Sequence, residues 1–164
     1  VVTDVLGVLE WLSDCSLASE TRTLQLPFRE ITEAEIRGEV FGAQRFIDPK
    51  LYEVSMPYLV ERMRERKSRL AHIQAIHIGP LSYVGIPAEY FVEYGLRLKI
   101  AAHPRRAHIV GQANGMVGYV PTREAFQRGG YETTFGLMSH LAPEAGDRIL
   151  DAAVELVCHK SVRQ

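Results

Sequence analysis

Two stretches of the chain alternate apolar and polar residues. One covers residues 20–28 and the other covers residues 71–78. The second is followed by Gly79-Pro80 and then by another apolar stretch over 81–86. Alternation at every second residue is typical of a half-buried strand, and a glycine-proline pair is typical of a turn. We therefore expect an early strand that ends near Pro27 and a later β-hairpin.

Helical periodicity and helix-start signals occur over most of the remaining chain. Thr32 followed by Glu35 forms a capping box, and Pro49 stands at a first helical position, with Pro57 as a candidate break. Helices are predicted over residues 2–13, 32–46, 48–69, 87–102, 121–126 and 143–158, and short strands over 108–112 and 116–120. The final helix carries an apolar stripe that we expect to be buried: Ile149, Ala153, Leu156 and Val157.

This mixture of elements predicts an α/β or α+β fold, with a mixed β-sheet covered by helices. The 164 residues suit a single domain, or most of one. An apolar fraction of 46% and a charged fraction of 24% are those of an ordinary soluble globular protein. A formal net charge of −1 provides no long-range field for nucleic acid or an anionic membrane. The basic run over 61–69 has two interpretations, a solvated helix face or a phosphate patch.

The chain contains no apolar stretch of the length that a membrane-spanning helix needs. Its first residues are apolar but carry acidic side chains and no basic region, so we do not expect them to be a signal peptide. Cys15 and Cys158 lack zinc-finger spacing and indicate either two thiols or one bridge. The compartment is not indicated by these features.

Glu89 is the first candidate for chemistry. It follows a predicted strand and falls in the first turn of the helix predicted over 87–102. The positive end of a helix dipole stabilises a carboxylate, and an ionised carboxylate is a suitable oxygen ligand for zinc. The alternative is an ordinary helix-start glutamate, which the same dipole favours.

Tyr131 and Asn114 are candidates that lie in turns. Tyr131 follows Gly129-Gly130, a pair that can adopt positive φ and so direct one side chain sharply. Asn114 begins a turn after a predicted strand, which is a common place for site residues. The alternatives are a packing tyrosine and a plain tight turn. The six histidines form no metal-binding motif, and no GxSxG or P-loop sequence occurs.

Taken in order, these segments resemble the neutral (non-lysosomal) ceramidases and their shorter bacterial relatives. In that family a strand leads through a Pro-x-Glu turn whose Glu binds the catalytic zinc, and a Tyr-Glu pair further on supplies a tyrosine ligand. The matching residues are Pro87-Ala88-Glu89, Ala113-Asn114, Gly118-Tyr119-Val120-Pro121-Thr122-Arg123-Glu124-Ala125-Phe126 and Tyr131-Glu132. The match runs from about Ile73 to Thr134. It implies that Glu89 and Tyr131 are metal ligands and that Asn114 and Tyr119 line the substrate pocket.

The chain also departs from the family pattern. The family's two histidine ligands, one of them in an HxHxxxG segment, and its serine nucleophile have no counterpart here. After the Tyr-Glu pair, Thr133-Thr134-Phe135 replaces the usual small residues, and we expect no immunoglobulin-like domain like the family's within residues 1–164. We therefore expect a C-terminal portion of a ceramidase-like catalytic domain, which needs a missing N-terminal half or a partner chain.

The resemblance implies part of a zinc-dependent amidohydrolase that acts on a lipid-like or other N-acyl amide. Zinc would bind only with histidine ligands from outside this chain. The alternative is a non-catalytic binding or assembly module that keeps the ceramidase-like fold.

Overall fold

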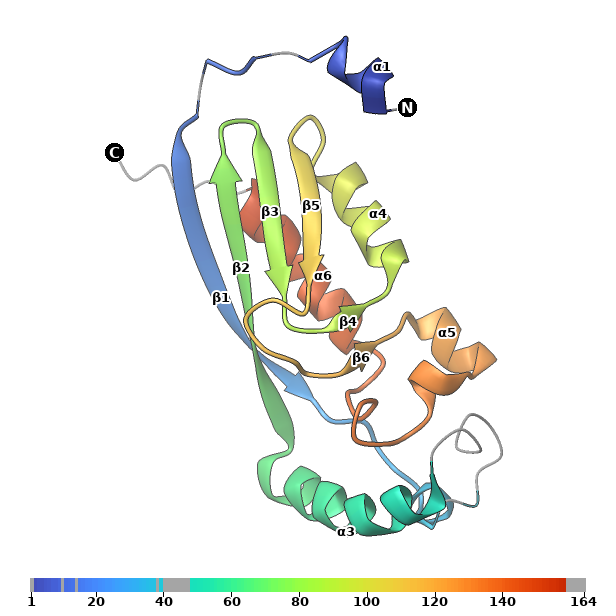
Figure 1. The fold of residues 1–164 in the computed structure, drawn as a ribbon. Helices are drawn as coiled ribbons and strands as arrows, with labels where there is room; N and C mark the ends of the chain where they lie inside the picture. The colour runs from blue at the N-terminus through green and yellow to red at the C-terminus, as the bar shows by residue number, and fades with distance from the viewer. Residues whose placement is uncertain (1, 10, 14, 38, 40–47, 159–164) are drawn as a thin grey trace.

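A four-stranded mixed sheet forms the centre of the computed structural model, which describes residues 2–9, 11–13, 15–37, 39 and 48–158 (Figure 1). The strand order is β1-β2-β3-β5. The strands are β1 (Leu17–Pro27), β2 (Ser68–Ile78), β3 (Leu81–Ile86) and β5 (Arg106–Gly111). The first three are mutually antiparallel, and β5 runs parallel to β3. The predicted mixed sheet, early strand and hairpin are confirmed.

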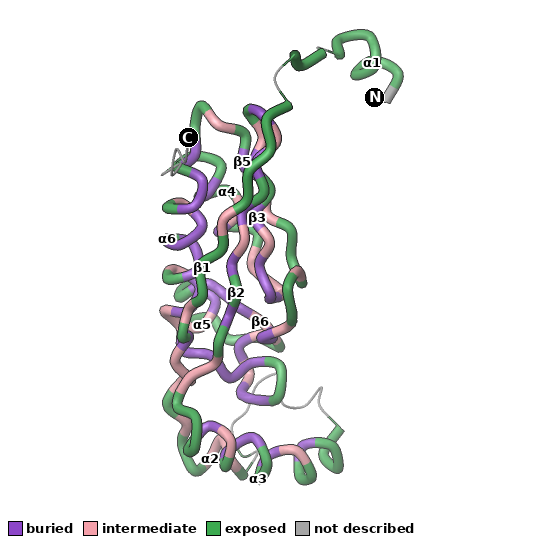
Figure 2. Tube along the Cα trace, turned by 90° about the vertical axis from the view of Figure 1, so that its left-hand side faces the viewer, coloured by how far each residue is buried: buried purple, intermediate pink, exposed green. Residues whose placement is uncertain are grey.

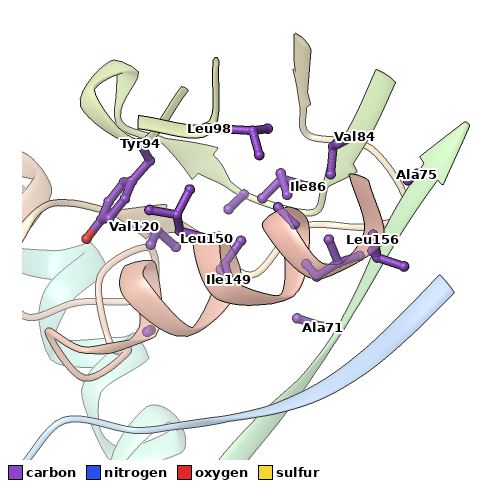
Figure 3. Close-up of a cluster of buried hydrophobic side chains, with 14 of the residues drawn as sticks. Ala71, Ala75, Val84, Ile86, Tyr94, Leu98, Val120, Ile149, Leu150 and Leu156 are labelled. Atoms are coloured by element: carbon purple, nitrogen blue, oxygen red, sulfur yellow. The ribbon is translucent and has the colours of Figure 1, made fainter. Parts of the chain in front are cut away.

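Two helices pack on one face of this sheet. Helix α6 (Ala145–Cys158) crosses β1, β2 and β3, and α4 (Val92–Ala101) packs against β5 and α6. The predicted stripe on α6 is buried, with each of its four residues at most 2% exposed. Figure 3 shows how the helices and the sheet interdigitate through Ile149, Leu156, Val84, Ile86 and Leu98. Burial of this apolar surface is the main force that holds the two layers together.

The other face of the sheet is not covered by α4 or α6, and residues that point to it are exposed; Figure 2 colours each residue along the trace by its burial. Ile76 and Tyr83 pair across β2 and β3, and the Tyr83 ring stacks on His108 of β5 with 5.7 Å between ring centroids. His72 and His77 lie five residues apart on β2 and so point to opposite faces: His72 is exposed, whereas His77 is buried on the helix-covered face, where its Nδ1 lies 2.8 Å from Ser82 Oγ.

Helix α3 (Pro49–Arg66) lies at the opposite end of the molecule from the N-terminal helix (Figure 1). Asp48 caps it, and Pro57 lies inside it without ending it. The helix packs through a second apolar cluster of Tyr52, Met56, Leu59, Met63 and Phe135. The short helix α2 (Glu33–Ile36) shows the predicted capping box. The predicted continuation of α2 is wrong at Arg37, its C-cap, and its later part, 40–47, lies outside the described residues.

The prediction of one helix over residues 2–13 is wrong. Helix α1 covers only Val2–Leu6 and is followed by Gly7, which is a poor helix former. Val5, Leu9 and Leu12 are 54%, 57% and 48% exposed, so the apolar spacing does not produce a buried face.

Three short elements complete the fold. Strand β4 (Glu89–Tyr90) pairs in parallel with β6 (Tyr119–Val120), apart from the main sheet. Helix α5 (Arg123–Arg128) begins after Thr122, whose side chain accepts a hydrogen bond from the Ala125 N–H.

Cys15 and Cys158 are free thiols. Among the described residues, no helix has the length and apolar character to cross a membrane.

Candidate functional site

Glu89 lies in a strand and not in the first turn of a helix, so that prediction is wrong. Helix α4 starts at Val92 and is preceded by Phe91 as its N-cap. The reason lies in contacts with a distant segment: the Glu89 N–H donates to the Gly118 carbonyl at 3.0 Å, and the Val117 N–H donates to the Pro87 carbonyl at 2.6 Å. These bonds hold residues 87–90 extended, and the helix dipole therefore does not act on Glu89.

Gly118 allows β6 to lie between β4 and the segment that contains Met138. Its φ is +101°, and a Cβ there would collide with the backbone carbonyl of Met138. The next residue, Tyr119, donates its N–H to that same carbonyl at 2.6 Å and lies opposite Glu89 in the β4–β6 pair. A residue without a side chain is thus required to place Tyr119 beside Glu89.

Tyr131 follows two glycines with φ of +73° and +138° and begins a short 3₁₀ turn, Tyr131–Thr133. The hydroxyl of Thr134 donates to the Gly130 carbonyl at 2.8 Å and stabilises this turn. The Tyr131 ring meets the Tyr119 ring edge-on, with 5.8 Å between centroids and 79° between planes. The glycine pair therefore directs Tyr131 towards Tyr119.

Tyr119 lies between the two predicted ligands. On one side it lines a shallow polar hollow with Glu89, Gln112 and Glu132. On the other side it lines an apolar cavity that Tyr131 also borders. Burial raises the pKa of the Tyr119 phenol, and the nearby Glu89 carboxylate adds to this effect, with smaller contributions from Tyr131 and Glu132. Tyr119 thus borders both the hollow that contains Glu89 and Glu132 and the cavity that Tyr131 lines.

Asn114, the other predicted pocket residue, lies against the main sheet. Its φ is +64°, as suits an Asn-Gly turn, and its Nδ2 donates to Gln74 Oε1 at 3.4 Å. Its amide also lies over Gly85 of β3. Neither the polar hollow nor the apolar cavity includes Asn114 among its lining residues.

Two arginines that sequence reasoning missed hold the site segments in place. The Arg29 guanidinium donates to the Thr133 carbonyl at 2.8 Å and pairs with Glu35 at 2.6 Å, which ties the Tyr131 turn to α2. Arg69 donates to the Met116 carbonyl at 2.5 Å, and its Nη1 lies 3.4 Å from His140 Nε2. Glu132 was also missed as a site residue, although the Tyr-Glu pair in the sequence marks its position.

The oxygen donors beside Tyr119 do not by themselves make a zinc site. Zinc is usually bound by four ligands, or by three protein ligands and a water, with histidine or cysteine among them. Glu89, Glu132 and Tyr131 supply only oxygen. Within the described ranges, no group of three or more histidine, cysteine, aspartate or glutamate side chains could hold a metal ion.

Ceramidases are among the solved structures that the fold of this chain resembles. The chain resembles the neutral ceramidase from Pseudomonas aeruginosa with 22% identity and a TM-score of 0.54, covering 87% of this chain and 28% of that one. It resembles a ceramidase complexed with C2 with 21% identity and a TM-score of 0.54, covering 87% of this chain and 30% of that one. No family model and no curated protein matches. The fold is therefore ceramidase-like, and the chain spans less than a third of these two enzymes.

Proposed function

We propose that this chain is the C-terminal portion of the catalytic domain of a zinc-dependent amidohydrolase, in which Glu89 and Tyr131 supply two of the metal ligands. The observation that best supports this proposal is that both residues lie next to Tyr119. Glu89 of β4 pairs with Tyr119 of β6, and the Tyr131 ring packs edge-on against the Tyr119 ring. The ceramidase-like fold supports the same proposal. Two histidine ligands and the nucleophile come from a preceding segment or from a partner chain.

The residues of this chain have separate roles in the proposed reaction. Glu89 offers a carboxylate and Tyr131 a phenol oxygen, and Tyr119 fixes the orientation of the Tyr131 ring. When bound, zinc supplies a Lewis acid for the carbonyl of an N-acyl amide and favours ionisation of a nucleophile or water. Asn114 remains a proposed pocket residue; its place beside Gln74 requires that the substrate extend over the end of the sheet.

The test is metal content and N-acyl amide hydrolysis in the longest polypeptide that carries this sequence. Glu89→Ala and Tyr131→Phe should each lower bound zinc and turnover at least tenfold. Matched controls are Glu93→Ala on α4 and Tyr58→Phe on α3, both at exposed positions. These controls should retain zinc and activity. Full zinc content and activity in both site variants would refute the metal-site assignment.

A second candidate is a non-catalytic module that binds another polypeptide. The observation that favours it is the apolar row on the open sheet face, where Ile76, Tyr83 and Val110 are 43%, 38% and 44% exposed. Exposed apolar clusters of this kind often mark interaction surfaces. An HxHxxxG segment in the coding sequence before Val1 would favour the hydrolase. Zinc-free protein that binds a partner through Tyr83, and loses it on Tyr83→Lys, would favour the module.

A further inference from the structure

An apolar cavity of about 140 Å³ lies between α3 and the segment that follows Tyr131. Leu51 and Met56 of α3 line one wall, and Leu137 and Met138 line the other. The α3 wall is held in place because Met56 belongs to the buried cluster around Phe135. Met56 thus fixes the inner wall, whereas Leu51, Leu137 and Met138, at 58%, 42% and 39% exposed, form the rim that opens to solvent.

The serine and threonine hydroxyl groups along the cavity are already hydrogen-bonded within the protein. Ser55 Oγ donates to the Tyr52 carbonyl at 3.3 Å, and Ser139 Oγ donates to the Glu132 carbonyl at 2.6 Å. The Thr134 hydroxyl also donates to a backbone carbonyl. A ligand in the cavity thus meets methyl, thioether and ring surface, while the hydroxyl protons are engaged elsewhere. The hydrophobic effect favours an apolar group there.

The cavity has one polar boundary. Tyr119 and Tyr131 border it, and Tyr119 also borders the polar hollow that contains Glu89 and Glu132. A ligand whose apolar end fills the cavity would place its polar group beside these two phenols. The arrangement suits a small amphiphile with one compact apolar end.

The volume limits the size of that apolar end. A dry apolar cavity of about 150 Å³ accommodates one benzene molecule. We propose that this cavity binds a compact apolar group of about six carbon atoms, either one aromatic ring or a short chain, attached to an amide that lies at Tyr119 and Tyr131. The amide part rests on the proposed function, whereas the apolar binding site does not. An extended long-chain acyl group is too large for it.

The test uses methyl NMR of this chain with ¹³C-labelled methionine. The chain has four methionines: Met56 and Met138 line the cavity, while Met63 on α3 and Met116 in a loop are not part of its lining and serve as internal controls. Benzamide and the linear primary amides from propanamide to octanamide are titrated in turn. Affinity should rise about fourfold per added methylene up to about six carbons and then stop rising, with shifts confined to Met56 and Met138.

Two variants on α3 form a matched pair. Ser55→Leu adds carbon atoms inside the cavity and should weaken benzamide and hexanamide binding at least tenfold. Val54→Leu adds one methylene at a position that is 79% exposed and should leave binding unchanged. Far-UV circular dichroism establishes that both variants are folded.

Three results would overturn the proposal: equal shifts at all four methionines, affinity that keeps rising through octanamide, or unchanged binding in folded Ser55→Leu. The amide series requires no metal, so its outcome is separate from the zinc test. Glu89→Ala should keep the same plateau. If Glu89→Ala keeps its zinc in the longer polypeptide and its amide affinities in this chain still stop rising at about six carbons, the metal-site proposal fails and the cavity proposal stands.

Discussion

His140 is a buried histidine, and we expect its protonation in acid to destabilise the folded state. It is 3% exposed and lies beside the Phe28 ring, with 5.5 Å between ring centroids. The Arg69 guanidinium is 3.4 Å from its Nε2. Burial, with a contribution from the positive charge of Arg69, lowers the pKa of His140 from 6.5 to about 4. Protonation would place a second positive charge in this apolar contact.

The depressed pKa determines the sign and the size of the effect. Between pH 6.5 and 4 the unfolded chain binds a proton at this position and the folded chain does not, so stability falls as the pH falls. Stability is fully present above pH 6.5. Linkage gives a loss of about 2 kcal/mol at pH 5 and about 3 kcal/mol at pH 4 from this group alone.

The assay is urea denaturation at several pH values, followed by far-UV circular dichroism. Fluorescence is unsuitable because Trp11, the one tryptophan in the sequence, is 96% exposed. As the pH falls from 6.5 to 4, the free energy of unfolding should fall less in His140→Gln than in the wild type. The difference should be about 2 kcal/mol at pH 5 and about 3 kcal/mol at pH 4. His72→Gln, at an exposed position, should keep the wild-type slope. Identical pH dependence in wild type and His140→Gln would refute the reasoning.

Glycine substitutions give two further predictions, each measured by thermal or urea unfolding. Gly118→Ala meets a backbone carbonyl at positive φ and should cost about 2 kcal/mol or more, whereas Gly129→Ala, at positive φ but with open space, should cost about 1 kcal/mol. Gly146→Ala drives a methyl group into the buried Tyr94 ring and should cost about 1–3 kcal/mol, whereas Gly95→Ala meets only an ordinary contact and should stabilise α4 by up to about 1 kcal/mol. Equal effects within either pair would contradict these assignments.

The main sheet and α6 were predictable because their signals are local. In β2, Ala71, Ile73 and Ala75 are each at most 1% exposed, as the alternation requires, and Gly79-Pro80 marks the hairpin. The parallel pairing of β3 with β5 was not predicted, because no short-range sequence pattern indicates which strand will pair with the free edge of β3. The segment 2–13 shows the converse, since apolar spacing there has no partner surface to bury it.

The candidate site was predictable only in part. The glycine pair before Tyr131 indicates a directed side chain. Glu89 was assigned the wrong element because Pro87-Ala88-Glu89 is a normal helix start, and only hydrogen bonds to the distant residues 117–118 keep it extended. The position of Tyr119 beside Glu89 and Tyr131, the two proposed ligands, depends on those same long-range bonds. Arg29 and Arg69 act on backbone carbonyls far along the chain, and such contacts leave no trace in local sequence.

The pairing of β1 with β2 has a consequence for how the chain folds. Leu17 pairs with Ile78 and Pro27 with Ser68, so every rung of this ladder closes a loop of roughly 40 to 60 residues. The β2–β3 hairpin closes a far shorter loop, and the β3-α4-β5 crossover a moderately shorter one. Because distant pairings form slowly, we expect β1 to join after β2, β3 and β5 have assembled from residues 68–111.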